Sequence, residues 1–205
     1  MNAPAGSERS FLWIAAAVFA LLAAANYIPV FGGEIPFPSE LVLRHAAWDG
    51  QQPADVMRRM PAIGDLITSF YPFHSLAGRA AREGDLALWN PYVLAGSPFA
   101  ANSQSALFYP FNFLYYILPV AVAWAICLFV RMFLAGFFMS LFVRMIGASA
   151  AGAIVAGIVF ACCGFMTAWQ GQGMGDAAIW LPMICYAVCR LRYRSSMASI
   201  ALAAF

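Results

Sequence analysis

Four long apolar runs constrain this chain more than any other feature of its sequence. They cover approximately residues 11–31, 120–143, 148–169 and 177–190. At about 1.5 Å of rise per residue, roughly twenty helical residues cross the ~30 Å hydrocarbon core of a bilayer. The last run is short, but Asp176 and Arg190 bracket a window adequate for a tilted helix. The runs predict an all-α polytopic membrane protein in which residues 1–205 form a single membrane domain.

Composition agrees with a membrane protein and excludes nucleic-acid binding. Hydrophobic residues make up 63% of the chain and charged residues 10%, whereas soluble domains carry about 25% charged residues. The net charge is only +2, so there is no basic surface for nucleic acid. The five cysteines lie in apolar runs, where thiols behave as small hydrophobes. Without His or carboxylate neighbours, even the helically spaced Cys185 and Cys189 do not predict a metal site.

The arginines predict the orientation of the spans. Arg9 precedes the first apolar run, Arg144 follows the second, and Arg190, Arg192 and Arg194 follow the fourth. The positive-inside rule places these residues and the N-terminus in the cytoplasm, and the loop of residues 32–111 outside. This loop carries five arginines, but loops of its length are largely exempt from the rule.

The beginning of the chain has an alternative interpretation, and the end of the chain carries a separate expectation. An arginine-bearing leader before the first run also fits a cleavable signal peptide. The run is longer than a signal peptide's apolar region, however, and "NYIPVFGGEIPFP" is a poor cleavage site. A further apolar run begins at Ile200 and stops at Phe205, so we expect the chain to be the N-terminal piece of a longer protein.

The loop of residues 32–111 is too long and too aromatic to be a linker. Its residues 63–83 have helical periodicity, with apolar side chains on one face and polar ones on the other. This pattern predicts an amphipathic helix lying in the membrane interface, with a kink or break near Tyr71 because Pro72 removes a backbone hydrogen bond. Asp65 would project from its polar side, and His74 lies on its apolar side.

The segment "GDLALWNPYVLAGSPFAANSQSALFYPFN", residues 84–112, is rich in Gly, Pro, Asn and Ser. Its turn residues leave no window long enough for helical or strand repetition, so it predicts irregular backbone tied by polar side chains. At membrane depth, such backbone occurs only packed on protein or lining a wet cavity. A cavity there is suited to chemistry on lipid headgroups.

Three stretches carry a resemblance to a known family. They are "GDLITSFYPFHS", "LALWNPYVLAGSPFAANSQSALFYPFNFLYYILP" and "FVRMFLAGFFMSLFVRMIG". Together they resemble the YfhO-type bacterial membrane protein family, whose members are similar to GT-C fold glycosyltransferases. Two positions depart from that pattern: Arg131 stands where the family more often has His, and "WQGQG" lacks a His that often follows the third span.

The resemblance implies an inverting enzyme in the bacterial inner membrane. Such an enzyme transfers a sugar from a polyprenyl-phosphate donor to a cell-envelope acceptor on the extracytoplasmic face. Its partners would be the lipid-linked donor and membrane lipids, while protein partners stay unidentified. Transfer needs a base for the acceptor hydroxyl and a cationic side chain or divalent metal for the departing phosphate. No cofactor is otherwise implied.

Candidate site residues follow from that chemistry, and each has a structural alternative. Asp65 matches the acid in the first outer loop of GT-C folds and is the candidate base; the alternative is a helix N-cap or first-turn acid. Arg58 and Arg59 could clamp phosphate or face solvent. Arg131 is an ionisable residue inside a span, hence a functional candidate or the partner of a carboxylate on a helix beyond this chain. Asn90 and Gln104 could contact sugar hydroxyls or tie irregular backbone.

Two other functions compete with the transferase. A transporter or flippase for lipid-linked material predicts interrupted helices with polar residues at the bilayer midplane. A noncatalytic membrane scaffold would use the outer loop only to dock a partner. Small residues at helical spacing, Gly136 with Ser140 and Gly152 with Ala156, predict close helix packing in either case.

Overall fold

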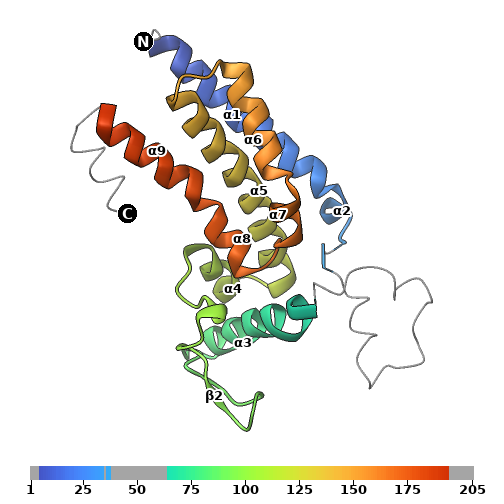
Figure 1. The fold of residues 1–205 in the computed structure, drawn as a ribbon. Helices are drawn as coiled ribbons and strands as arrows, with labels where there is room; N and C mark the ends of the chain where they lie inside the picture. Colours follow the sequence, from blue (N-terminus) through green and yellow to red (C-terminus); the bar gives the residue numbers. More distant parts are fainter. Residues whose placement is uncertain (1–4, 35, 38–63, 194–205) are drawn as a thin grey trace. The chain divides into compact units, whose positions relative to one another are not determined.

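The computed structural model describes residues 5–34, 36, 37 and 64–193 (Figure 1). Most of these residues are helical, and four helical windows are long and apolar enough to cross a membrane. The windows are Ser7–Asn26, Val120–Met145, Ala150–Ala168 and Gly173–Arg192. The chain is therefore a mostly helical protein with four candidate membrane spans.

Two of the four windows are interrupted helices. The first window lies in the single helix α1 (Ala5–Asn26), which the short α2 (Ile28–Phe31) follows. The second window is the single helix α5 (Val120–Met145). The third divides into α6 (Ala150–Ala161) and α7 (Gly164–Ala168), and the fourth into α8 (Gly173–Ala178) and α9 (Trp180–Tyr193). Because Pro182 has no N–H to donate to the Ala178 carbonyl, a continuous helix is disfavoured there. The fourth window takes in Asp176, which the sequence placed at its edge.

The residues cluster into two compact units by their contacts. Among the described residues, the span unit comprises 5–28, 128–170 and 174–193, and the loop unit comprises 29–34, 36, 37, 64–127 and 171–173.

The core of the span unit is built around Phe19. This ring is fully buried in a cluster with Phe11, Ala15 and Ala153. A Cβ added at Gly157 would lie 2.5 Å from the carbonyl oxygen of Gly136 and would also overlap the Phe19 ring. Glycine at these positions therefore lets α1, α5 and α6 approach closely.

The small residues of α6 that make this contact are not the predicted ones. Gly152 is exposed and Ala156 is half-buried, whereas Ala153 and Gly157, one residue further along, face the core. The prediction for α5 fits better, since Gly136 touches Phe19 and Ser140 is fully buried. The spacing was right for both helices, but the face of α6 was wrong by one residue.

An ion pair joins the beginning of α1 to the end of α5. Arg144 donates to Glu8 Oε1 at 2.8 Å and to the Ala148 carbonyl at 2.8 Å, with its guanidinium over the Phe11 ring. This pair brings Glu8, next to Arg9, to the same end of the span unit as Arg144. The assignment of Arg9 and Arg144 to the cytoplasm stays a prediction.

The loop unit is organised around the helix predicted over residues 63–83. Its first segment, η5 (Leu66–Phe70), is a π-helix, and at Tyr71 it continues as α3 (Tyr71–Arg82), with Pro72 in the first α-helical turn. His74 is buried and stacks on Tyr115 with ring centroids 4.0 Å apart. Gly78 lies so close to the Tyr115 carbonyl that a Cβ would overlap it. The buried side of the helix thus packs on α4 (Leu114–Ile117).

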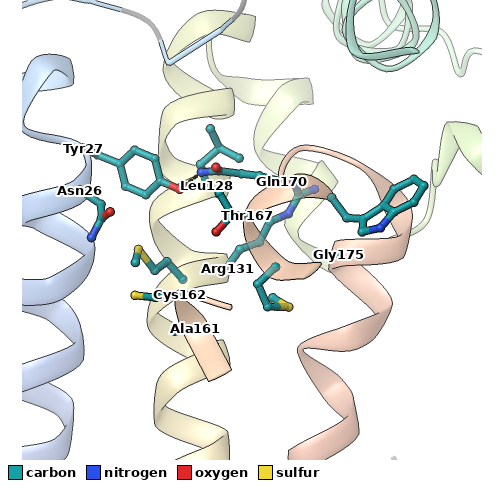
Figure 2. A pocket seen from close by; sticks show the side chains of 12 residues that line it. Asn26, Tyr27, Leu128, Arg131, Ala161, Cys162, Thr167, Gln170 and Gly175 are labelled. Atoms are coloured by element: carbon teal, nitrogen blue, oxygen red, sulfur yellow. Dashed lines mark hydrogen bonds between the residues drawn. The ribbon is translucent and has the colours of Figure 1, made fainter. Parts of the chain in front are cut away.

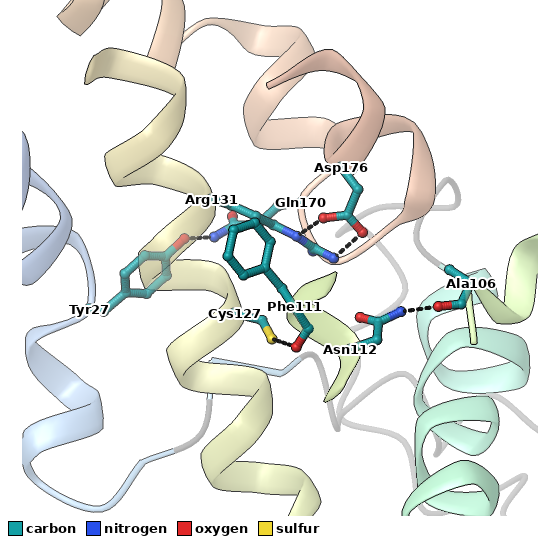
Figure 3. A network of polar contacts seen from close by, with 8 residues as sticks. All are labelled: Tyr27, Ala106, Phe111, Asn112, Cys127, Arg131, Gln170 and Asp176. Carbon is teal, nitrogen blue, oxygen red and sulfur yellow. Dashed lines mark hydrogen bonds and ion pairs between the residues drawn. The ribbon is translucent and has the colours of Figure 1, made fainter. Parts of the chain in front are cut away.

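The polar segment after α3 contains short elements joined by turns. Strands β1 (Trp89–Asn90) and β2 (Ser97–Pro98) pair antiparallel, and the 3₁₀ turns η6 (Ser103–Ser105) and η7 (Pro110–Phe113) lead to α4. Asn side chains tie this backbone, as Figure 3 shows for the Asn112 amide, which donates to the Ala106 carbonyl at 2.9 Å. The sequence did not predict the hairpin, because two-residue strands have no detectable period.

Substituting Gly157 tests the close packing of the span unit. We expect Gly157→Ala to lower the free energy of unfolding by about 1–3 kcal/mol, because the added methyl overlaps a backbone carbonyl and a buried ring. Gly164→Ala is the matched control, since nothing lies within 4 Å of its added Cβ. Unfolding by denaturant in mixed micelles measures both. Equal stability of the two variants would contradict the packing described here.

Candidate functional site

The span unit contains a pocket of about 270 Å³ (Figure 2). Its wall is formed where α1 ends, along the middle of α5, and from the end of α6 to the beginning of α8. Polar side chains in the wall are Asn26, Tyr27, Arg131, Thr167 and Gln170. Apolar side chains include Leu128, Met132 and Met166. The volume lies slightly below the usual range for ligand sites, roughly 300–1,000 Å³.

Arg131 and Asp176 form a buried ion pair beside this pocket (Figure 3). Nε and one terminal nitrogen of Arg131 donate to the two carboxylate oxygens of Asp176, and the side chains are only 9% and 8% exposed. Arg131 comes from α5 and Asp176 from α8, so the pair links the second and fourth candidate spans. This two-point contact between guanidinium and carboxylate compensates both charges in a buried place where an unpaired charge would be costly.

The carboxylate partner of Arg131 therefore lies within this chain. The sequence had left open either a functional role for Arg131 or a carboxylate partner on a helix beyond this chain. The signal was present, because Asp176 is the only acidic residue after Asp85. A charged arginine in the middle of a span calls for a nearby acid, and only this one was available in the sequence. The substrate-binding role predicted for Arg131 remains untested by this geometry.

A second polar contact joins the end of α1 to the segment after α7. Gln170 Nε2 donates to the hydroxyl oxygen of Tyr27 (Figures 2 and 3). Tyr27 follows the first span, and burial raises its pKa to about 12, partly offset by the charge of Arg131. The hydroxyl is therefore protonated and neutral at physiological pH. Sequence reasoning did not single out Tyr27 or Gln170, because no pattern links two uncharged residues so far apart in the chain.

Asp65 lies in the loop unit, at the beginning of η5. It is exposed, its backbone is helical, and its side chain makes no cap hydrogen bond. The N-cap alternative is thus not the geometry observed, although a favourable interaction with the helix dipole needs no hydrogen bond. Its predicted role as a base stays a prediction.

The other candidate residues occupy different settings. Arg58 and Arg59 lie outside the described residues. Asn90 is 5% exposed, and its side-chain oxygen accepts the Tyr92 N–H at 3.0 Å. Gln104 is exposed, and its backbone N–H donates to the Asn102 side chain at 3.0 Å. The Asn90 side chain thus holds irregular backbone, which is the structural alternative given for it above. The exposed Gln104 amide remains available to solvent.

Two further results bear on the kind of site. Within residues 5–34, 36, 37 and 64–193, no group of three or more His, Cys, Asp or Glu side chains could hold a metal ion. Comparisons of the chain with protein-family models, with curated proteins and with solved structures find no match. The resemblance to YfhO-type proteins therefore stands as a prediction from the sequence.

Removing one member of the buried pair tests its role. We expect Asp176→Asn to lower the free energy of unfolding by about 3–5 kcal/mol, because it leaves the Arg131 charge buried and uncompensated. The double replacement Arg131→Met with Asp176→Leu should cost less than the single one, because no charge remains in the apolar interior.

The control for this prediction is the partly exposed pair at the other end of the span unit. Arg144 and Glu8 have side chains 25% and 45% exposed, so Glu8→Gln should cost about 0–1 kcal/mol. Denaturant unfolding in mixed micelles compares the variants. A loss for Asp176→Asn no larger than for Glu8→Gln would show that the buried pair does not form.

Proposed function

We propose that this chain belongs to a membrane glycosyltransferase of the bacterial inner membrane. It would transfer a sugar from a polyprenyl-phosphate donor to a cell-envelope acceptor on the extracytoplasmic face. The proposal is supported by the four candidate spans, the resemblance to YfhO-type and GT-C proteins, and the setting of Asp65. The setting of Asp65 carries the most weight, because it concerns the group that would do the chemistry.

The reaction follows from the bonds that must change. The acceptor hydroxyl oxygen attacks the anomeric carbon, and a new carbon–oxygen bond forms with inversion. The bond from that carbon to the phosphate oxygen breaks, and the polyprenyl phosphate leaves with the electron pair. The proton of the acceptor hydroxyl passes to a base. Atoms and charge balance without a redox partner.

Asp65 is suited to the role of base by its position. An acid that receives a proton from an acceptor must be accessible and not committed to holding the fold. Asp65 is exposed and makes no cap hydrogen bond. The helix it leads is anchored, since Leu66, Phe70 and His74 are buried. The anchored helix holds the backbone of Asp65 in place while its carboxylate stays accessible.

The departing phosphate requires positive charge or a metal ion. Arg58 and Arg59 remain the proposed phosphate ligands, and Asn90 and Gln104 the proposed sugar contacts. Arg131 remains a proposed substrate-binding residue, but Asp176 compensates its charge, which makes it a poor phosphate ligand. A phosphate that approached Arg131 would have to share the guanidinium with Asp176.

A transporter or flippase for lipid-linked material is the second candidate, and one observation favours it. The third and fourth candidate spans are both interrupted helices, at residues 162–163 and at Ile179. The buried pair of Arg131 and Asp176 lies close to the second interruption. Broken helices beside intramembrane polar groups are typical of transporters. The two functions differ in whether a carboxylate is needed for turnover.

Replacing the proposed base separates the two functions. We expect Asp65→Asn in the full-length protein to reduce sugar transfer about 10²- to 10⁴-fold, because the amide cannot accept the proton. Glu83→Gln, an exposed acid immediately after α3, is the matched control and should retain activity. Transfer is measured with a radiolabelled polyprenyl-phosphate sugar in membranes, with protein amounts equalised by immunoblot.

Undiminished transfer by Asp65→Asn would reject Asp65 as the base. Loss of transfer in both variants would show that any charge change at this helix disrupts the protein. If neither the parent protein nor the variants transfer sugar, but all move a fluorescent lipid-linked sugar across vesicle membranes, the transporter proposal replaces the transferase.

A further inference from the structure

We propose that the pocket of the span unit binds an uncharged, hydroxyl-bearing headgroup, such as the sugar unit of a membrane lipid. The pocket is the one formed by Asn26, Tyr27, Thr167 and Gln170 together with the apolar side chains around Leu128. The assignment rests on the proposed function for the ligand's role as a substrate. The binding itself is argued from the wall of the pocket.

The charge in the wall is compensated. Arg131 is the pocket's basic side chain, and both oxygens of Asp176 accept from it. An anionic headgroup such as a phosphate would therefore meet a site of no net charge. It would pay the cost of losing its hydration without an equal electrostatic gain. The pair thus disfavours an anion and leaves neutral ligands as the better match.

The uncharged polar groups of the wall suit a ligand that both donates and accepts hydrogen bonds. The Thr167 hydroxyl donates its proton to the Cys163 carbonyl at 3.1 Å, so its oxygen can act only as an acceptor toward a ligand. Tyr27 accepts from Gln170 and keeps its own proton to donate. Asn26 donates to the Leu22 carbonyl at 2.9 Å and retains an amide oxygen. Sugar hydroxyls can donate to such acceptors, whereas a phosphate dianion has no proton to donate.

The apolar part of the wall fits the remaining surface of a sugar ring and the beginning of a lipid chain. Leu128, Met132 and Met166 line the pocket together with the polar side chains. Methionine side chains adapt to irregular shapes. A volume of about 270 Å³ has room for one ring and excludes a whole lipid. Figure 2 shows Asn26, Tyr27, Thr167 and Gln170 arranged around this space.

Cys162 provides a reporter at the pocket. Its side chain is exposed and lines the wall, whereas the neighbouring Cys163 is half-buried and does not line it. Two versions of the full-length protein, each with one of these cysteines and the others replaced by alanine, differ only in the position of the thiol. The rate of alkylation by a maleimide in phosphatidylcholine nanodiscs then reports occupancy of the pocket.

We expect n-octyl-β-D-glucoside to slow alkylation of Cys162 in a saturable way and to leave Cys163 unaffected. n-Octyl phosphate and n-octanol, which share the same chain, should protect much less. Thr167→Val should raise the glucoside concentration for half-protection roughly 2- to 10-fold, the cost of one hydrogen bond. In Thr167→Ser, which keeps the hydroxyl, the glucoside should protect Cys162 at the same concentration as in the parent protein.

Three outcomes would overturn the assignment. Equal or better protection by octyl phosphate would identify an anion site, equal protection by octanol a purely apolar one, and no protection by any probe would exclude a ligand pocket. The test is separate from that of the transferase, because Asp65 does not line the pocket. Asp65→Asn should reduce transfer about 10²- to 10⁴-fold while leaving the protection of Cys162 unchanged.

Discussion

The buried ion pair of Arg131 and Asp176 is the interaction on which the span unit depends. A bilayer interior cannot solvate a lone guanidinium, so α5 can hold Arg131 at this depth only beside a compensating acid. Asp176 supplies it from α8 and so fixes the beginning of the fourth candidate span against the middle of the second. Apolar helices in lipid gain little from the hydrophobic effect between them, so close packing and polar links such as this one hold them together.

The same pair shapes the chemistry of the pocket. It neutralises the charge of Arg131. The uncharged hydroxyls and amides of Asn26, Tyr27, Thr167 and Gln170 are then left to bind a ligand, and they suit a neutral headgroup. The interruption of the fourth span is part of this arrangement. Pro182 prevents a continuous helix from Gly173 to Tyr193, and the short α8 carries the carboxylate. Apolar packing of α1, α5 and α6 around Phe19 supports the rest of the unit, together with the ion pair of Glu8 and Arg144.

Much of the fold could be predicted from the sequence, because the bilayer imposes length and hydropathy on each span. The helix after residue 63 followed from apolar periodicity. Near Tyr71, where Pro72 predicted a kink or break, the structure has a change from π-helix to α-helix. The division of the fourth span could have been predicted from Pro182 by the same reasoning. The face of α6 that packs inward could not, since Gly152–Ala156 and Ala153–Gly157 are equally small pairs and only tertiary contacts choose between them.

The pocket was harder to predict than the spans. Asp176 could have been assigned as the partner of Arg131, being the only acid in the second half of the chain. Tyr27 and Gln170 could not have been paired, because neither charge nor spacing relates them. The site residues predicted from the resemblance lie mostly in the loop unit or outside the described residues, and their chemical roles require activity measurements.

A distance measurement in lipid tests the buried pair most directly. Protein labelled with ¹⁵N at arginine and ¹³C at aspartate carboxyls can be studied in bilayers by dipolar recoupling in solid-state NMR. A signal that reports a guanidinium nitrogen near a carboxylate carbon, and that disappears in Asp176→Asn, is the predicted result. A spectrum in which Asp176→Asn removes no such coupling would contradict the pairing of the second and fourth spans.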